Sequence, residues 1–213
     1  MKLYMHAGAC SLSPHIVCRE LDLPVELVEV DRRTHRTPGG ADYLAVNGNG
    51  YVPALALDDG TVLIEGPAIV QYLADLRPAA GLAPPSGTLD RTRLHSWLNF
   101  ITSELHKPLA MLMDPAMQPA RAPLVAKVSK RLDWVVAQLT GPYLMGERFT
   151  VADPYLFVCL NWSPYNKLEL ERWPALIEFM RRIGDRPAVR AATAAEGLAK
   201  PDPAGVFFAS TRA

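Results

Sequence analysis

A proline- and glycine-rich segment divides the chain into two parts whose apolar residues repeat with different periods. Before this segment, short apolar runs alternate with amphipathic ones, and after it apolar residues recur only at helical spacing. We therefore expect an α/β domain over residues 1–77, a linker over 78–88, an all-helical domain over 89–200 and a tail over 201–213. The residues that mark the linker are Pro78, Gly81, Pro84, Pro85 and Gly87.

The first domain reads as strand, helix, strand, a loop, then two strands and a helix. Asp58-Asp59-Gly60 predicts a hairpin between the last two strands, which would make the sheet mixed. This order is that of thioredoxin-like domains, whereas the second domain is expected to be a helical bundle. Strands are expected at 2–5, 25–30, 54–57 and 61–64, and helices at 14–23, 66–76, 90–105, 124–139, 151–163, 173–184 and 187–198.

Charge and composition disfavour several functional classes. The 22 Lys and Arg residues balance 22 Asp and Glu residues, whereas nucleic-acid binders usually carry a basic excess, so no nucleic-acid partner is expected. No apolar run approaches the ~20 residues needed to cross a bilayer, and no signal peptide is recognised, so no membrane partner is expected. Three scattered cysteines do not suggest a disulfide framework or a metal site. We expect a cytoplasmic protein with reduced thiols and no metal.

Cys10 is the strongest candidate for chemistry. It follows the first predicted strand and precedes the first helix, where unpaired backbone N–H groups and the positive end of the helix dipole gather. This position predicts a lowered thiol pKa, and the thiolate is the reactive form. Ser11 and Ser13 could donate hydrogen bonds to the sulfur. The alternative is a small buried cysteine, which is the favoured interpretation of Cys18 and Cys159.

Two dipeptides could bind the backbone and charges of a peptide ligand. Val52-Pro53 precedes the third strand, where thioredoxin-like domains have a cis proline, and the Val52 backbone could then pair with a peptide. The alternative is an ordinary trans proline at a sheet edge. Glu65-Gly66 begins a predicted helix, where Glu65 could bind an ammonium group and the Gly66 N–H a carboxylate. The alternative is a glutamate that only satisfies the helix dipole.

A polar stripe is expected on the helix that begins near Asp90. Asn99, Ser103 and His106 should share one face, opposite an apolar stripe. Such faces are usually only solvated, but His106 and Lys107 could face the Cys10 thiol from the second domain. His106 could donate a hydrogen bond or carry a proton near neutral pH, and Lys107 would attract an anionic ligand.

Two further motifs are expected to be structural. Thr150 and Asp153 form a capping-box pattern before an apolar run, so replacing either should weaken folding before chemistry. In the tail, Val206, Phe207 and Phe208 suggest that this segment packs on the rest of the molecule.

Taken together, these motifs resemble those of the beta-class glutathione transferases of bacteria, from Met1 to about Leu198. The resemblance implies a thioredoxin-like domain followed by a helical bundle, glutathione as cosubstrate, no metal and a homodimer. The segments that carry it are residues 8–15, 52–55, 65–66, 68–73, 97–101, 104–107 and 143–153.

The resemblance also implies a role for each candidate residue. Cys10 would lie beside the glutathione sulfur and could form a mixed disulfide with it, while His106 and Lys107 would border the sulfur. Val52 would pair with the cysteinyl backbone, and part of the glutathione site would come from across a dimer interface. The implied catalytic residues are Cys10 and His106, and the implied glutathione-binding residues are Ser11, His35, Val52, Pro53, Glu65, Gly66, Asn99, Ser103, Glu104 and Lys107.

Two positions depart from the family pattern. His35 stands where the family commonly has a lysine that binds the glycyl carboxylate, although Arg33 or Arg36 could compensate. Pro108 replaces a small or flexible residue, and it should kink the helix at His106-Lys107 and reshape the electrophile pocket.

The leading hypothesis is an enzyme that adds the glutathione thiolate to small apolar electrophiles, with thiol–disulfide exchange through Cys10 as a related activity. The alternative is a catalytically weak protein of the same fold that binds apolar ligands or docks a partner. His35 and Pro108 keep this alternative open, whereas the set of Cys10, Val52, Glu65 and His106 argues against it.

Overall fold

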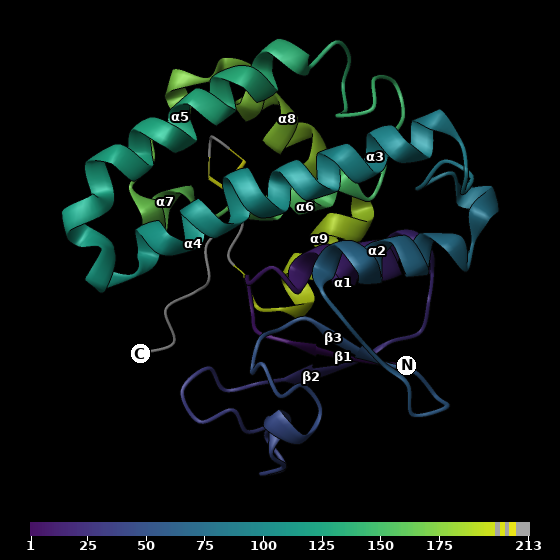
Figure 1. The fold of residues 1–213 in the computed structure, drawn as a ribbon. Coiled ribbons are helices and arrows are strands. Elements are labelled where there is room, and N and C mark those ends of the chain that lie inside the picture. Colours follow the sequence, from purple (N-terminus) through teal and green to yellow (C-terminus); the bar gives the residue numbers. More distant parts are fainter. Residues whose placement is uncertain (199–200, 203–204, 208–213) are drawn as a thin grey trace.

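The computed structural model describes residues 1–198, 201–202 and 205–207. Figure 1 shows a small sheet with two helices beside it, continuing into a larger group of helices. The strands and helices expected over residues 1–77 are present, with ends shifted by at most three residues. These elements are β1 (Lys2–Met5), α1 (Leu12–Glu20), β2 (Glu26–Glu29), β3 (Ala54–Ala56), β4 (Val62–Ile64) and α2 (Gly66–Asp75), with a 3₁₀ turn, η1 (Tyr43–Ala45), between β2 and β3.

The four strands form one mixed sheet in the order β2-β1-β3-β4. β1 is parallel to β2 and antiparallel to β3, and β4 closes the hairpin with β3, which confirms the thioredoxin-like order. Side chains alternate between the two faces. Leu3 and Met5 are buried in the core shared with α1 and α2, whereas Tyr4 lies on the other face, 5.2 Å from Tyr43 between ring centroids. In Figure 1 the segment that contains η1 lies on that second face, away from α1 and α2.

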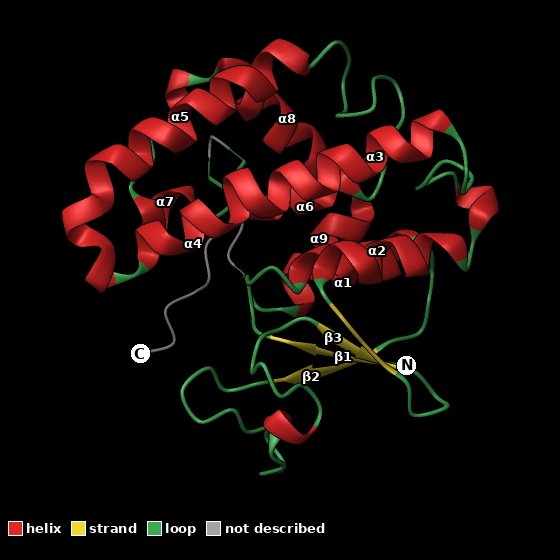
Figure 2. Cartoon of the chain, in the orientation of Figure 1, coloured by secondary structure: helices red, strands yellow, loops and turns green. Residues whose placement is uncertain are grey.

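The regular elements of the second domain are all helices in its described part, as expected, and loops connect them (Figure 2). Every residue of α6 is buried, so this helix is the centre of the domain, and it is apolar except for Asp153 and the hydroxyl of Tyr155. The helices are α3 (Leu89–Phe100), α4 (Lys107–Met113), α5 (Arg121–Gln138), α6 (Ala152–Leu160), α7 (Ser163–Asn166), α8 (Pro174–Gly184) and α9 (Pro187–Ala195), with a π-helical segment, Ile101–His106, between α3 and α4.

The π-helical segment lies immediately before Pro108. The Lys107 N–H donates to the carbonyl of Thr102, five residues earlier, whereas an α-helical N–H donates to the carbonyl four residues earlier. Proline has no N–H, and its ring crowds the carbonyl of residue i−4, so a wider preceding turn relieves this conflict. The disturbance expected at Pro108 is therefore present as a change of helix type over residues 101–106.

The peptide of Gly8, between β1 and α1, joins the two domains. Its N–H donates to Glu196 Oε2 at 2.8 Å, and its carbonyl accepts from Trp162 Nε1 at 2.9 Å. Glu196 Oε1 also lies 2.8 Å from His15 Nδ1, and both side chains are fully buried. Gly8 has φ of 71°, a left-handed conformation that favours glycine. Groups following α6 and α9 thus hold the loop that leads into α1.

Val206 and Phe207, two described residues of the tail, pack on the helical domain, as the apolar residues there suggested. Val206 and Phe207 are buried, while Phe208 lies outside the described residues. Asn161 Nδ2 donates to the Phe207 carbonyl at 2.7 Å, and the Phe207 N–H donates to Asn161 Oδ1 at 2.6 Å. This reciprocal pair anchors the tail beside the end of α6.

Asp153 and Thr150 form only part of the expected capping box. Asp153 is fully buried, and its carboxylate accepts from the Leu144 N–H at 2.8 Å and from the Thr150 N–H at 2.7 Å. The Thr150 hydroxyl donates to the same carboxylate at 3.1 Å and caps no helical N–H. The Asp153 half of the box is therefore present and the threonine half is not, because the hydroxyl proton is directed to the carboxylate.

We expect Asp153→Asn to lower the free energy of unfolding by about 2–4 kcal/mol, because an amide N–H₂ replaces an acceptor that faces buried donors. Thr150→Val removes one hydroxyl donor and should cost about 1 kcal/mol. Urea denaturation of both variants beside the wild type measures the difference. Equal losses for the two substitutions would show that the carboxylate is not the centre of this network.

Candidate active site

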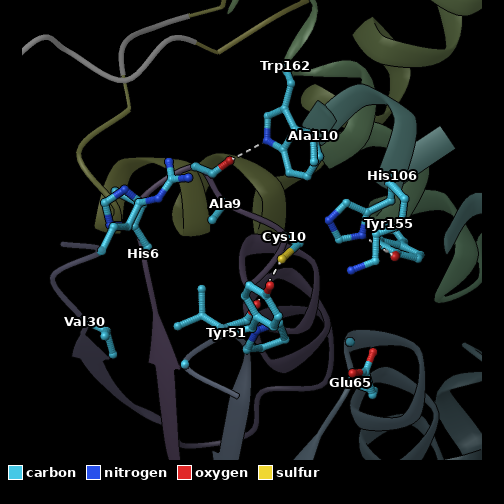
Figure 3. Close-up of a pocket in the computed structure, with 18 of the residues that line it drawn as sticks. His6, Ala9, Cys10, Val30, Tyr51, Glu65, His106, Ala110, Tyr155 and Trp162 are labelled. Atoms are coloured by element: carbon cyan, nitrogen blue, oxygen red, sulfur yellow. Dashed lines mark hydrogen bonds between the residues drawn. The ribbon is translucent and has the colours of Figure 1, made fainter. Parts of the chain in front are cut away.

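A cavity of about 540 Å³ lies between the two domains. Its walls come from the β1–α1 loop, the segment before β3, the start of α2, α4 and the connection from α6 to α7. Figure 3 shows Cys10 near the middle of this cavity, with His106 and Tyr155 on one side and His6 on the other. Eight of the twelve predicted site residues line it, so the structure gathers most of the site from distant segments: Cys10, His35, Val52, Pro53, Glu65, Gly66, His106 and Lys107.

Cys10 and Val52 meet directly in the cavity wall. The Cys10 thiol is half-buried, and it donates a hydrogen bond to the Val52 carbonyl at 3.1 Å. The Val52–Pro53 peptide bond is cis, which confirms the expectation from the order of the elements. Cys18 and Cys159 are fully buried, so their assignment to the core is also confirmed.

The predicted lowering of the Cys10 pKa is wrong. Burial raises the pKa of this thiol to about 11. The backbone N–H groups of Cys10 and Ser11, and the charge of Lys107, act in the opposite direction but are outweighed. The helix N-terminus therefore does favour the thiolate, but the loss of solvent around the sulfur has the larger effect and keeps the thiol protonated.

Neither serine beside Cys10 is placed to bind its sulfur. Ser11 is fully buried outside the cavity wall, where it accepts from the His6 N–H at 3.2 Å and donates to the His6 carbonyl at 3.2 Å. Its single proton is therefore used inside the loop. Ser13 is also buried, and its hydroxyl has no hydrogen-bond partner among the described residues. Ser11 thus shapes the loop that presents Cys10.

His106 is held in the cavity wall by a chain of hydroxyl groups. Its Nδ1 lies 2.7 Å from Tyr155 Oη, which lies 3.2 Å from Thr102 Oγ1, and Thr102 donates to the Leu98 carbonyl at 2.8 Å. Burial, with a smaller effect of the Lys107 charge, lowers the pKa of His106 to about 4. The ring is therefore neutral at neutral pH and can donate or accept a hydrogen bond, while its expected role as a proton carrier stays a prediction.

Asn99, Ser103 and Glu104 lie outside the cavity. Asn99 and Ser103 are exposed, and Glu104 forms an ion pair with Arg131 at 2.6 Å. The expected common face with His106 is not kept, since the π-helical segment changes the spacing between these residues and His106. Their assigned glutathione contacts, partly across a dimer interface, stay a prediction.

Glu65 and His35 line different parts of the cavity. Glu65 is exposed and directly precedes α2, and the N–H of Gly66 is in the first turn, where helical N–H groups have no internal acceptor. The His35 ring packs against Gly50, where an added Cβ would lie 2.8 Å from His35 Cε1. Neither Arg33 nor Arg36 lines the cavity, so neither is placed to compensate for His35 in binding the glycyl carboxylate.

Several cavity residues were not predicted as part of the site. Tyr155 and Trp162 lay in an apolar run that looked like core, although their hydroxyl and indole N–H groups require partners and could have marked them. His6 and Arg32 follow two parallel strands, and ligands commonly bind beyond the carboxyl ends of such strands. Phe207 is too far along the chain from the other cavity residues for any local sequence pattern to have placed it in this cavity.

Two kinds of feature are absent from the described residues. No helix there is both long enough and apolar enough to span a bilayer. No three His, Cys, Asp or Glu side chains in the described part of the chain group closely enough to hold a metal ion.

Comparison with known proteins identifies the class that this fold and site define. The sequence profile for the glutathione S-transferase N-terminal domain matches residues 7–76, and the profile for the C-terminal domain matches residues 95–196. The glutathione S-transferase GstA of Escherichia coli O157:H7 is 45% identical over 200 residues, which cover 93% of this chain and all of that protein.

Solved structures agree with the sequence comparison. BphK, a bacterial glutathione S-transferase solved as a ternary complex, has 52% identity and a TM-score of 0.91, covering 93% of this chain and 100% of that one. A sphingomonad glutathione S-transferase complexed with glutathione has 46% identity and a TM-score of 0.89, with the same coverage. A beta-class enzyme of Sphingomonas chungbukensis has 43% identity and a TM-score of 0.89, covering 92% of this chain and 99% of that one. The chain belongs to the glutathione S-transferase family and is close to its bacterial beta class, which confirms the resemblance in its motifs.

The pKa of Cys10 predicts its alkylation rate. Because a thiol with a pKa near 11 is mostly protonated at lower pH, its reaction with iodoacetamide should rise about tenfold per pH unit from about pH 6 to 9.5, without a plateau. Mass spectrometry of the Cys10 peptide measures the rate, and Cys10→Ser gives the background. A plateau with a midpoint below about pH 8 would mean that the helix N-terminus dominates after all.

Proposed function

We propose that this protein conjugates glutathione to small apolar electrophiles in the cavity between its domains. The observation that carries the proposal is the convergence of Cys10, Val52, Glu65 and His106, which come from four separate segments, on one cavity. The similar sphingomonad enzyme was solved with glutathione bound, which supports the tripeptide as the ligand. A pure scaffold has no need of such a set of groups.

Glutathione would bind along the first domain. Glu65 pairs with the ammonium group of its γ-glutamyl residue, and the Gly66 N–H at the start of α2 binds the adjacent carboxylate. The backbone of Val52 pairs with the cysteinyl residue as a neighbouring strand would. Antiparallel pairing directs the glycyl end toward Tyr51 and Gly50, the residue on which the His35 ring packs.

The glutathione sulfur would then lie between Cys10, His106 and Lys107. The Lys107 ammonium group favours the thiolate because the two charges attract in a partly desolvated site. The neutral His106 ring is oriented by Tyr155, so its other nitrogen is available to groups near the sulfur. The thiolate adds its electron pair to the electrophilic carbon, and the leaving group departs with the pair from the broken bond.

The opposite wall of the cavity suits an apolar electrophile. Trp162, Phe207 and Met113 line it, and Trp162 lies 5.1 Å from His106 between ring centroids. Aromatic and methionine side chains present an adaptable apolar surface. This wall joins the sulfur position to the part of the cavity beside the tail.

We also propose thiol–disulfide exchange through Cys10 as a second activity. In this reaction the Cys10 thiolate attacks a glutathione disulfide, which forms the mixed disulfide and releases glutathione thiolate. The raised pKa of Cys10 reduces the thiolate population at neutral pH, so conjugation is the better supported activity.

We also propose a cytoplasmic homodimer. Asn99 and Ser103 are exposed on the second domain, where a partner subunit could bring them to its own glutathione site, with Glu104 beside them. A monomer in sedimentation equilibrium would contradict the dimer, and cell fractionation tests the location.

Glu65→Gln should raise the dissociation constant for glutathione about 10- to 100-fold, because a charge-assisted hydrogen bond to the ammonium group is lost. Isothermal titration calorimetry measures the constant, and turnover of an activated aryl halide measures conjugation. Glu178→Gln, on the exposed side of α8 outside the cavity, is the matched control and should behave as the wild type. No detectable binding of glutathione by the wild type would reject both enzymatic activities and leave the apolar-ligand-binding alternative.

Cys10→Ala separates the two activities. It should abolish glutathione-dependent disulfide reduction, while conjugation of the aryl halide falls by less than about tenfold, because glutathione supplies its own sulfur. Both rates are measured on the same preparation, with Cys18→Ala as the buried-cysteine control. Loss of both activities in a folded Cys10→Ala protein would make Cys10 essential for conjugation.

A further inference from the structure

Two basic side chains lie at the part of the cavity that the proposed glutathione position leaves unused. His6 follows β1 and Arg32 lies just beyond β2, and both line the cavity. Because these strands are parallel, with Met5 opposite Glu29, the two residues leave the same edge of the sheet. Figure 3 shows His6 and Glu65 on opposite sides of Cys10.

Neither basic group is fully satisfied by the protein. Arg32 is exposed to the cavity and makes no hydrogen bond or ion pair with the described residues, whereas Arg91 and Arg131 both pair with carboxylates. His6 Nδ1 is buried and likewise has no hydrogen-bond partner in the described part of the chain. A buried polar atom without a partner is uncommon and unfavourable, so a ligand that supplies one is expected to bind here.

The two groups are close enough to influence each other. Burial lowers the pKa of His6, and the charge of Arg32 lowers it further. Glu29, a hydrogen bond with the Val30 backbone and Glu196 oppose this effect, but Glu196 already accepts from the Gly8 N–H and contacts His15. An anion beside Arg32 and His6 would therefore gain a guanidinium charge and a ring N–H donor without displacing an existing ion pair.

An aromatic wall adjoins this basic pair. Trp162 donates its indole N–H to the carbonyl of Gly8, two residues after His6, and its ring faces the same cavity. Phe207 closes the wall on the tail side. The surroundings therefore match a molecule with an apolar body and one anionic group.

We propose that Arg32 and His6 form a carboxylate-binding subsite of the electrophile pocket, so that the preferred electrophiles are apolar molecules carrying a carboxylate. This inference rests on the proposed conjugating function and names its substrate class. The glycyl carboxylate of glutathione is the other possible source of the anion, but antiparallel pairing with Val52 directs it toward Gly50 and His35. The experiment separates the two sources.

The test compares two electrophiles that differ only in charge: 4-chloro-3,5-dinitrobenzoate and its methyl ester. Each kcat/KM, measured at saturating glutathione, is divided by the uncatalysed rate constant to remove intrinsic reactivity. We expect the wild type to favour the carboxylate, and Arg32→Met to lower this preference about tenfold or more. His6→Leu should lower it in the same direction, while Arg33→Met, next in the chain but outside the cavity, should keep it.

An unchanged preference in Arg32→Met overturns the subsite. Equal losses for both electrophiles, together with a raised calorimetric dissociation constant for glutathione, would assign Arg32 to the glycyl carboxylate and also overturn it. If the wild type turns over neither electrophile, the conjugating function fails, and binding then tests the subsite alone. In that arm 3,5-dinitrobenzoate should bind about tenfold more tightly than 3,5-dinitrobenzamide, and Arg32→Met should abolish the difference. Equal affinities in the wild type would reject the subsite.

Discussion

The peptide of Gly8 is the point on which the geometry of the site depends. Its N–H and carbonyl are both bound by groups from the second domain, Glu196 and Trp162. Glu196 is fully buried and also contacts His15 of α1, so the removal of either partner would leave an uncompensated polar group in the core. The loop between β1 and α1 carries His6 and Cys10, and both therefore take their positions from the docking of the two domains.

Burial acts in opposite directions on the two titratable groups beside the sulfur position and leaves both neutral. It raises the pKa of Cys10 to about 11 and lowers that of His106 to about 4. Lys107 is a cation whose charge acts on both groups, and its exposed side chain lines the same cavity. In a partly desolvated cavity its charge has a larger effect on an anionic sulfur than it would have in bulk water. Beside the sulfur position the site thus combines two neutral hydrogen-bonding groups, Cys10 and His106, with the positive charge of Lys107.

Local patterns were sufficient to predict the strands and most of the helices, because alternation, helical spacing and turn residues report on neighbouring positions. The cis Val52–Pro53 bond was predicted only through the thioredoxin-like order of these elements. Properties that depend on tertiary packing were not accessible in this way. The pKa of Cys10 depends on how much of the second domain covers it, and the π-helical segment reflects how the chain accommodates Pro108. Tyr155 looked like a core residue because the hydroxyl it binds, and the cavity it faces, come from other helices.

The hydrogen bond between Gly8 and Glu196 also affects the order of events during synthesis. These residues are 188 positions apart in the chain. At about 5–20 residues per second, the loop that carries Cys10 waits on the order of ten to forty seconds after its own synthesis before Glu196 is made. Until then the N–H of Gly8 lacks its carboxylate partner, whereas Trp162, the partner of the Gly8 carbonyl, is made earlier. The nascent first domain can form its sheet early, but the loop that carries Cys10 reaches its final position only after Glu196 has been made.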